Sequence, residues 1–481
     1  MKEKSLKLNA ALYGIKIGLS ILFPLITFPY ASRILQVENI GKINFSNSII
    51  SYFSLIAALG VSTYAIREGA GIRTNQKKLT EFANEIFTIN VLSTLLSYLL
   101  LAILIVLSPR LQNYMLLLFI QSIAIIFTTI GVDWIYSIYE DYFYITVRTL
   151  IFQLVSLILL FILVHTKEDY YLYALVMVIS NVGANILNFI HSRKYFKIKL
   201  TKSLNLSKHI KSILIIFSTS IATTIYVNSD LTMLGLFSGD YSVGLYSVSV
   251  KIYMIVKLLM VTVVTVALPR LSFYIANGMN NEYNKTLSKI FNSLIILVIP
   301  AIVGINILCE EIILILSGKN YLEASSSLHI LSISLIFSIL AIFTTSAILL
   351  PMKKEIYILK ATIISAIVNV LLNFFLIPLF KENGAAISTV IAEFLVLSIS
   401  YMEARKYVKL RGIGKNLFSS IIGCLFIFIF TLVLKKVTNN LISYTILTTL
   451  GSVVVYYLVL LLFKNQLVLE LTDTLKRIII R

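Results

Sequence analysis

The sequence ILQVENIG, residues 34–41, returns in altered form as FSGDYSVG, residues 237–244. Each of these short polar stretches joins one long apolar segment to the next. Both end in a glycine, and the shift that aligns Gly41 with Gly244 therefore defines an internal repeat. The repeat predicts that the chain consists of two related halves that run in the same direction through the fold.

More distant positions keep the same order. The shift that aligns the two glycines also aligns Arg67 with Arg270. A slightly larger shift aligns Arg148 with Lys360. Parallel repeats are a transporter architecture in which the substrate path lies between the halves.

Apolar segments occupy nearly the whole chain from Ala10 to Phe463. We count about 14 of them, each near the roughly 20 residues that a helix needs to cross the hydrocarbon of a bilayer. Of the 481 residues, 58% are hydrophobic and only 13% are charged, whereas soluble domains carry about 25% charged residues. The sequence therefore predicts an all-α polytopic membrane protein with about 14 transmembrane helices.

The net charge of +19 is unevenly distributed between the two predicted faces of the membrane. About 30 Lys and Arg residues lie on the side that holds both termini and about 8 on the other, which predicts that both termini are cytoplasmic. Since topology accounts for most of the basic charge, we expect no nucleic-acid partner.

The longest polar stretch, residues 191–211, is basic and joins the two predicted halves. We therefore predict an N-lobe over residues 1–190, a cytoplasmic connector over 191–211 and a C-lobe over 212–403. Residues 404–481 then form an appended helix pair with a basic tail.

Motifs for enzymatic chemistry are missing from the sequence. It contains no phosphate-binding loop, no G-x-S-x-G nucleophile motif and no His or Cys spacing typical of a metal site. We therefore expect no enzyme activity, no cofactor and no bound metal. Uphill transport would then require an Na⁺ or H⁺ gradient, or consumption of the product.

Several stretches resemble one family of membrane proteins. In the first half they are GVSTYAIRE (60–68), GVDW (131–134) and EDYFYITVR (140–148); in the second half they are NSD (228–230), VGLYS (243–247), LPR (268–270) and GAA (384–386). In these stretches the chain resembles the bacterial oligosaccharide (O-antigen and capsule repeat-unit) flippases. That family belongs to the multidrug/oligosaccharidyl-lipid/polysaccharide exporter superfamily.

The resemblance spans the first twelve predicted helices and implies two lobes around a cavity that opens alternately to each side. It implies a protein of the bacterial cytoplasmic membrane that flips undecaprenyl-pyrophosphate-linked oligosaccharide outward for O-antigen, capsule or exopolysaccharide synthesis. The implied partners are the lipid-linked oligosaccharide, membrane lipids, and a polysaccharide polymerase with its chain-length machinery.

Alternatives remain open at this point. A peptidoglycan-precursor flippase and a cation-coupled multidrug exporter share the expected fold. A membrane glycan polymerase or ligase is less favoured, because those families carry a large outer loop and every outer loop here is short.

Polar side chains within apolar segments are the candidate site residues, because charged groups are costly in hydrocarbon and usually face a cavity or a partner. We predict substrate contacts from Lys16, Arg67, Arg148, Asn228, Asp230, Lys251, Lys257, Arg270, Lys360, Asn369 and Asn373. We predict ion coupling from Asp133, Asp230 and Glu393.

Each of these residues also has a structural interpretation. Asp230 and Lys251 lie at similar depths on consecutive segments, so they can form a cavity pair or a fixed packing pair. Lys257 lies near mid-bilayer with no evident partner in sequence, and it either attracts a pyrophosphate or bonds to backbone carbonyls. Asp133 is a cavity carboxylate or a partner of Arg148.

The remaining candidates divide in the same way. Glu393 has no basic neighbour in sequence, and a partly desolvated carboxylate can carry a proton or bind Na⁺. The three asparagines can bond sugar hydroxyls or join helices. Four cations lie at the ends of segments and either anchor the topology or form a basic vestibule for the lipid pyrophosphate; they are Arg67, Arg148, Arg270 and Lys360.

Overall fold

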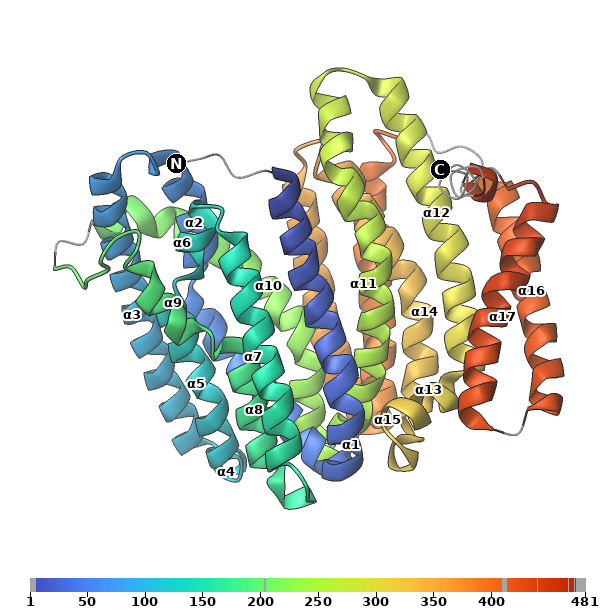
Figure 1. The fold of residues 1–481 in the computed structure, drawn as a ribbon, viewed down its shortest axis with the longest axis horizontal. Coiled ribbons are helices and arrows are strands. Elements are labelled where there is room, and N and C mark those ends of the chain that lie inside the picture. Colours follow the sequence, from blue (N-terminus) through green and yellow to red (C-terminus); the bar gives the residue numbers. More distant parts are fainter. Residues whose placement is uncertain are drawn as a thin grey trace. The chain divides into compact units, whose positions relative to one another are not determined.

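All regular structure in the described residues is helical in the computed structural model of the chain (Figure 1). The structure describes residues 6–202, 205–408, 413–438, 440–465, 467–470 and 472; before Phe23 it describes the backbone but not the side chains. The chain divides into two compact units, here called the N-unit (Met1–Gly244) and the C-unit (Leu245–Arg481).

In the N-unit the long helix α1 packs against α3, α5, α7 and α10. The helices are α1 (Leu6–Ala58), α2 (Val61–Ile72), α3 (Gln76–Leu107), α4 (Pro109–Gln112), α5 (Met115–Gly131), α6 (Asp133–Ile138), α7 (Tyr142–Leu163), the 3-10 turn η1 (Lys167–Asp169), α8 (Tyr170–Val182), α9 (Asn185–Ser192) and α10 (Leu206–Phe237). The first residues of α11 also belong to this unit.

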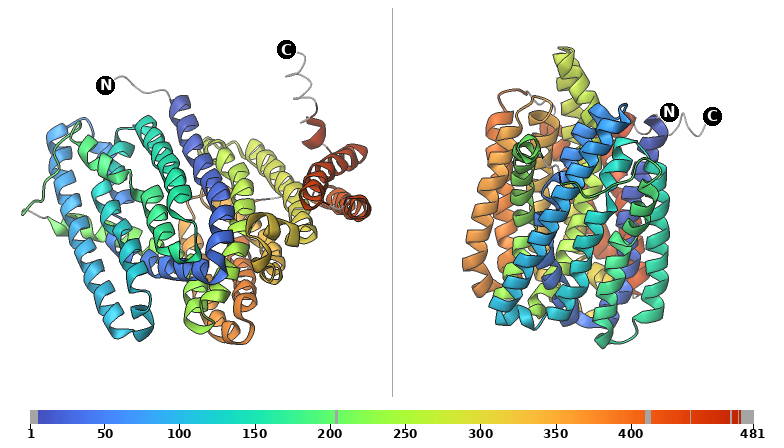
Figure 2. Two further views of the ribbon diagram at one scale, coloured as in Figure 1. Left: turned by 60° about the horizontal axis from the view of Figure 1, so that its bottom comes forward. Right: turned by 90° about the vertical axis from the view of Figure 1, so that its left-hand side faces the viewer.

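In the C-unit the helix α14 packs along α15, and α12 lies between α14 and α16. The helices are α11 (Asp240–Ala276), α12 (Asn280–Ile307), α13 (Cys309–Leu316), the 3-10 turn η2 (Lys319–Tyr321), α14 (Ala324–Ile342), the π-helix η3 (Phe343–Leu349), α15 (Glu355–Ala404), α16 (Ile413–Val437) and α17 (Leu441–Leu462). A hairpin of α11 and α12 projects beyond the other helices of this unit (Figures 1 and 2).

Eleven of the described helices are long and apolar enough to cross a membrane, and α5 is apolar but only 17 residues long. Helices satisfy their own backbone hydrogen bonds, which is why apolar sequences of this length adopt them in lipid. Both α1 and α15 contain a non-helical residue, Gln36 (φ 64°) and Lys381 (φ 50°), at which each divides into two helical parts. The predicted all-α membrane fold is confirmed, while the number of fourteen spans stays a prediction.

The two copies of the internal repeat lie against each other. A methyl group on Gly41 would lie 1.8 Å from the backbone oxygen of Asp240, and one on Gly244 would lie 2.1 Å from the backbone oxygen of Val37. Val37 and Asp240 are themselves equivalent under the shift that aligns the glycines. The contact is therefore reciprocal, as expected for related segments packed about a pseudo-two-fold axis, and both glycines permit backbones to approach closely.

The predicted connector is only partly irregular. Helix α9 ends at Ser192 and α10 begins at Leu206, so the last residues of the predicted 191–211 stretch are helical. The contact-based division falls at Gly244 and leaves α10 in the N-unit. The predicted lobes were defined by the repeat in the sequence, whereas the two compact units are defined by packing. The predicted lobes therefore stay a prediction.

Candidate functional site

A buried arginine and a half-exposed carboxylate form the polar centre of the N-unit. Arg148, on α7, has a side chain that is only 6% exposed, and one of its terminal nitrogens lies 2.8 Å from Oδ1 of Asp133. Its other terminal nitrogen donates to Oδ1 of Asn185 at 3.2 Å, and Asn188 also donates to the Asp133 carboxylate. The predicted Asp133–Arg148 contact is thus present. The Nε of Arg148 has no hydrogen-bond partner within the described part of the chain.

Breaks in the helices position this N-unit cluster (Asp133, Arg148, Asn185 and Asn188). Val132 has a left-handed conformation (φ 42°) between α5 and α6, which places Asp133 at the start of a new helix. Gly131 lies against Asn185, and a Cβ at Gly131 would be 2.6 Å from the Asn185 amide carbon. Neither asparagine was predicted from the sequence, although their spacing of three residues on one helix face was a usable signal.

Aromatic rings surround the N-unit cluster. Tyr144 stacks on His191, with ring centres 4.0 Å apart, and on Tyr136, at 5.1 Å. The Tyr136 hydroxyl donates to the backbone oxygen of Asn188 at 2.6 Å. The Tyr136 and His191 rings also contact each other, with centres 6.0 Å apart, so the three rings form one aromatic cluster beside these residues.

A loop tyrosine ties the same region together. Tyr195 stacks on Tyr139, and its hydroxyl donates to Oδ2 of Asp141 at 2.7 Å. Burial, together with this bond to a carboxylate, raises the pKa of Tyr195, so the phenol stays protonated and remains a donor at neutral pH.

An ion pair lies deep in the C-unit, between two helices that are far apart in sequence. The Nζ of Lys257, on α11, lies 2.6 Å from Oε1 of Glu393, on α15, and their side chains are 17% and 7% exposed. The Tyr253 hydroxyl accepts from Lys257 at 3.2 Å and donates to Glu393 at 3.3 Å. We call Tyr253, Lys257 and Glu393 the C-unit cluster.

The C-unit cluster supplies a partner for each of two charged residues that have none nearby in sequence. Lys257 has a specific carboxylate partner, and it is not a lone cation bonded only to backbone carbonyls. Glu393 has a basic neighbour in space, Lys257, which lies 136 positions earlier in the sequence on another helix. Tyr253, which was not predicted, lies one helical turn before Lys257 and also approaches Ser334 Oγ at 3.3 Å. A ligand for either charged group must therefore compete with the other.

Asp230 and Lys251 lie in different units. Asp230 is buried on α10 of the N-unit, close enough to Tyr52 for the two groups to interact electrostatically. Lys251 is partly buried on α11 of the C-unit, one and a half turns before Lys257. Their pairing stays a prediction.

The cations at helix ends share one local arrangement. Arg67 lies over the Tyr64 ring, Arg148 over Tyr144, Arg270 over Tyr274 and Lys360 over Tyr357, at 5.4–5.9 Å. Each tyrosine is three or four positions away on the same helix, so these contacts are local. Arg67 also pairs with the adjacent Glu68 at 2.9 Å. The predicted basic vestibule stays a prediction.

The other predicted site residues form hydrogen bonds mainly with residues of their own helix. The Asn228 amide donates to the Thr224 backbone oxygen of its own helix. Asn369 and Asn373 are fully buried, bond to each other at 3.2 Å, and Asn373 also accepts from Ser388 across the Lys381 break. This geometry favours helix joining for the last two. The Lys16 side chain lies outside the described residues.

A buried histidine was also missed. His209, at the start of α10, lies with Nε2 2.5 Å from Glu85 on α3 and Nδ1 2.8 Å from the Tyr64 hydroxyl on α2. The side chain of His209 is 0% exposed. This contact holds three helices together, and nothing in local sequence indicated it.

Comparisons with known proteins agree with this architecture. Residues 6–275 match a family model described as polysaccharide biosynthesis protein. The chain is 24% identical over 406 residues to a protein of Escherichia coli (strain K12) named as an O-antigen transporter, across 83% of this chain and 97% of the relative. It is 28% identical over 257 residues to the capsular polysaccharide biosynthesis protein CapF of Staphylococcus aureus, across 52% of this chain and 64% of that relative.

A solved structure shares the fold. The lipid II flippase MurJ, in an inward closed conformation, aligns with a TM-score of 0.76 over 96% of this chain and 100% of its own, at 18% identity. This similarity supports the fold class and leaves the substrate open.

Proposed function

The chain belongs to the polysaccharide biosynthesis protein family, and from this premise we propose that it flips a lipid-linked oligosaccharide. The proposed substrate is an undecaprenyl-pyrophosphate-linked repeat unit. The proposed movement is from the inner to the outer leaflet of the bacterial cytoplasmic membrane by alternating access. The protein is a multi-pass membrane protein by its apolar helices, and the relative named as an O-antigen transporter supports the substrate class.

One observation carries the proposal at the level of residues. Lys257 and Glu393 form an ion pair inside apolar helices, where charged groups are expensive and usually serve a transport path. An apolar pair of similar size would fill the same space without the cost of desolvating two ions. We infer that the members of this pair exchange partners during transport.

This exchange would link the binding of a cation at Glu393 to the binding of substrate at Lys257. A proton or Na⁺ on Glu393 neutralises the carboxylate, which frees the Lys257 ammonium for the pyrophosphate of the substrate. Release of the pyrophosphate lets the lysine return to Glu393 and expel the cation. The Tyr253 hydroxyl bonds to both groups and can reorient when Glu393 gains or loses the proton.

In the N-unit, the Asp133 carboxylate is half exposed and can accept bonds from sugar hydroxyls. Arg148 and Asn188 hold this carboxylate in place. We assign Arg148 to positioning and Asp133 to direct contact with the glycan.

Deleting the protein in its own bacterium tests the proposed function. We expect the lipid-linked oligosaccharide to accumulate on the cytoplasmic face, surface polysaccharide to disappear, and peptidoglycan synthesis to continue. Accumulation of a lipid-linked peptidoglycan precursor instead would favour the other flippase class. Normal surface polysaccharide with increased drug sensitivity would favour the multidrug exporter.

A further inference from the structure

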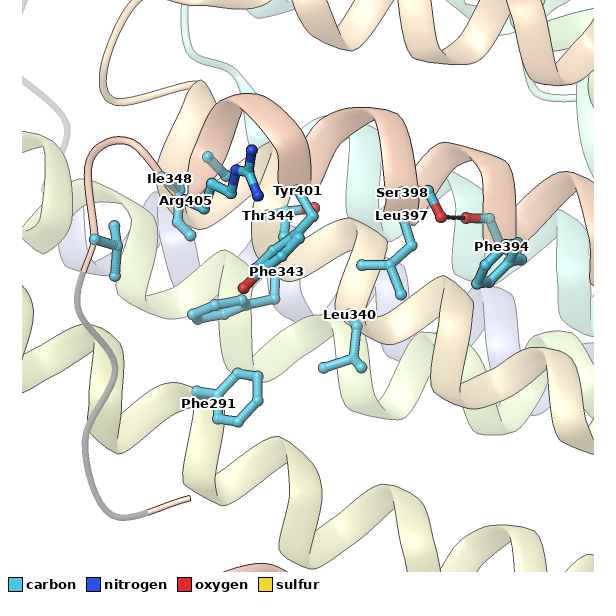
Figure 3. A pocket seen from close by; sticks show the side chains of 12 residues that line it. Phe291, Leu340, Phe343, Thr344, Ile348, Phe394, Leu397, Ser398, Tyr401 and Arg405 are labelled. Atoms are coloured by element: carbon cyan, nitrogen blue, oxygen red, sulfur yellow. Dashed lines mark hydrogen bonds between the residues drawn. The ribbon is translucent and has the colours of Figure 1, made fainter. Parts of the chain in front are cut away.

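The C-unit contains an apolar groove that plays no part in the ion-pair cluster (Figure 3). Its volume is about 520 Å³, and its walls come from α12, α14, the π-helix η3 and the C-terminal part of α15. We call it the Arg405 groove, after the one charged residue in its lining. A cavity of this size lies in the range that binds small molecules. π-helical turns such as η3 also recur beside functional sites.

The groove is apolar along its length and basic at one end. Phe394, Leu397 and Tyr401 follow one another along α15, with Arg405 directly after its end. They face Leu340 of α14 and Phe343 of η3 (Figure 3). Phe394 and Arg405 are separated by roughly 16 Å of helical rise. Phe394 and Tyr401 are 49% and 51% exposed, so the groove opens on the surface of the C-unit.

The hydroxyl groups of Thr344 and Ser398, which line the groove, are already bonded within the protein. Thr344 Oγ1 lies 2.7 Å from the Ser400 hydroxyl, and Ser398 donates to the Phe394 backbone oxygen at 2.8 Å. Apart from Arg405 and the Tyr401 hydroxyl, the groove therefore offers little to a sugar or a peptide, which would need many hydrogen bonds. An unbranched hydrocarbon chain fits this lining.

Arg405 itself is available to an external anion. Among the described residues, no carboxylate lies within ion-pair distance of its guanidinium, whereas the adjacent Lys406 pairs with Glu403 at 2.6 Å. Arg405 also lies in a basic cluster on the predicted cytoplasmic side. Basic pockets between transmembrane helices on that side bind the headgroups of anionic lipids.

We propose that the Arg405 groove binds a membrane phospholipid with an anionic headgroup, with one acyl chain along α14 and α15 and the phosphate at Arg405. An undecaprenyl chain has about three times as many carbons as an acyl chain and exceeds a groove of this size. The occupant is therefore a resident phospholipid and not the tail of the transported substrate.

Photochemical labelling tests this assignment on the full-length protein in liposomes. Phosphatidylglycerol and phosphatidylcholine, each with the same diazirine-bearing acyl chain, are cross-linked in parallel and the labelled peptides are mapped by mass spectrometry. We expect phosphatidylglycerol to label α14 and α15 at the groove more strongly than phosphatidylcholine. Arg405→Gln should lower the phosphatidylglycerol signal about fivefold, the loss expected for one charge near a membrane surface.

Two further variants separate binding from folding. Lys406→Gln removes the same charge one residue away, outside the lining, and should leave the labelling unchanged. Leu340→Trp fills the groove and should reduce labelling by both lipids there. Equal labelling by the two lipids in the unmodified protein, or an unchanged signal in Arg405→Gln, would overturn the proposal. Displacement of phosphatidylglycerol by an equal amount of undecaprenyl phosphate would overturn the choice of occupant.

Discussion

The buried ion pair between Lys257 and Glu393 makes a quantitative prediction about single residues. Either Lys257→Ala or Glu393→Ala leaves an uncompensated charge in a largely apolar interior. We expect each to destabilise the protein by about 3–5 kcal/mol. The double variant should recover part of that loss, because it leaves no charge behind. Thermal unfolding in detergent measures all three.

Arg67→Ala is the matched control, since it breaks a pair whose side chains are 59% and 46% exposed. That change should cost no more than about 1 kcal/mol. A double variant less stable than both single variants would contradict the ion-pair account.

Arg148→Lys separates the charge of Arg148 from its geometry. The guanidinium reaches Asp133 and Asn185 with different nitrogens, which one ammonium cannot reproduce. We expect flipping to fall about tenfold, the effect of one lost charge-assisted hydrogen bond. Arg73→Lys, at a half-exposed single pair with Glu140, should remain close to the unmodified rate. Equal rates in Arg148→Lys and the unmodified protein would remove the positioning role.

Two ion pairs show which contacts could be predicted from the sequence and which could not. Asp133 and Arg148 are 15 positions apart on adjacent helices, and their contact was predicted as one of two options. Lys257 and Glu393 are 136 positions apart, so their contact depends on how α11 packs against α15. The sequence identified both charges as unusual, because charge in an apolar segment is a local property. It could not pair them, because pairing is a tertiary property.

At the scale of elements, the close approach of Gly41 on α1 to the start of α11 is a testable contact. Gly41→Ala and Gly244→Ala each place a methyl group about 2 Å from a backbone oxygen of the opposite segment. Since backbone atoms cannot move aside easily, we expect both variants to lose stability and flipping. Thermal unfolding and a flipping assay measure the two effects.

Gly304→Ala in α12 provides the control, because nothing lies within 4 Å of the added methyl group. It should leave stability unchanged or slightly increased. Retention of full stability by Gly41→Ala would show that the two repeat segments do not pack as described.

The same elements show what a repeat in the sequence reveals. The alignment of Gly41 with Gly244 predicted two related segments, and the structure adds that the segments touch reciprocally. Hydropathy predicted apolar helices with a short polar joint at residues 34–41, and the break at Gln36 lies within that joint. Gln36 and Lys381 are neither glycine nor proline, so residue type did not indicate their positive φ angles.

For the whole molecule, the distribution of Lys and Arg predicts which ends of the helices face the cytoplasm. Lys285→Cys lies at the α11–α12 hairpin and Lys319→Cys in η2, and both positions are exposed. In intact cells we expect a membrane-impermeant maleimide to label the second position and not the first. The native Cys309 and Cys424 are buried and should give little background. The reverse labelling pattern would invert the topology.

Fold class and family were accessible from the sequence, because length, hydropathy and short motifs are local properties of the chain. The candidate site was accessible only in part. Its charges were recognised, while Asn185, Asn188, Tyr253 and the His209 contact emerged only from the packing of helices.

The most direct test of the flippase proposal measures the leaflet position of the substrate in proteoliposomes. A fluorescent undecaprenyl-pyrophosphate oligosaccharide is placed in both leaflets, and an external glycosidase reports the accessible fraction. We predict that nearly all of the substrate becomes accessible with the unmodified protein, that Lys257→Ala stays near the half seen in protein-free liposomes, and that Lys257→Arg lies between them. If the unmodified protein leaves half of the substrate protected, the proposal is wrong.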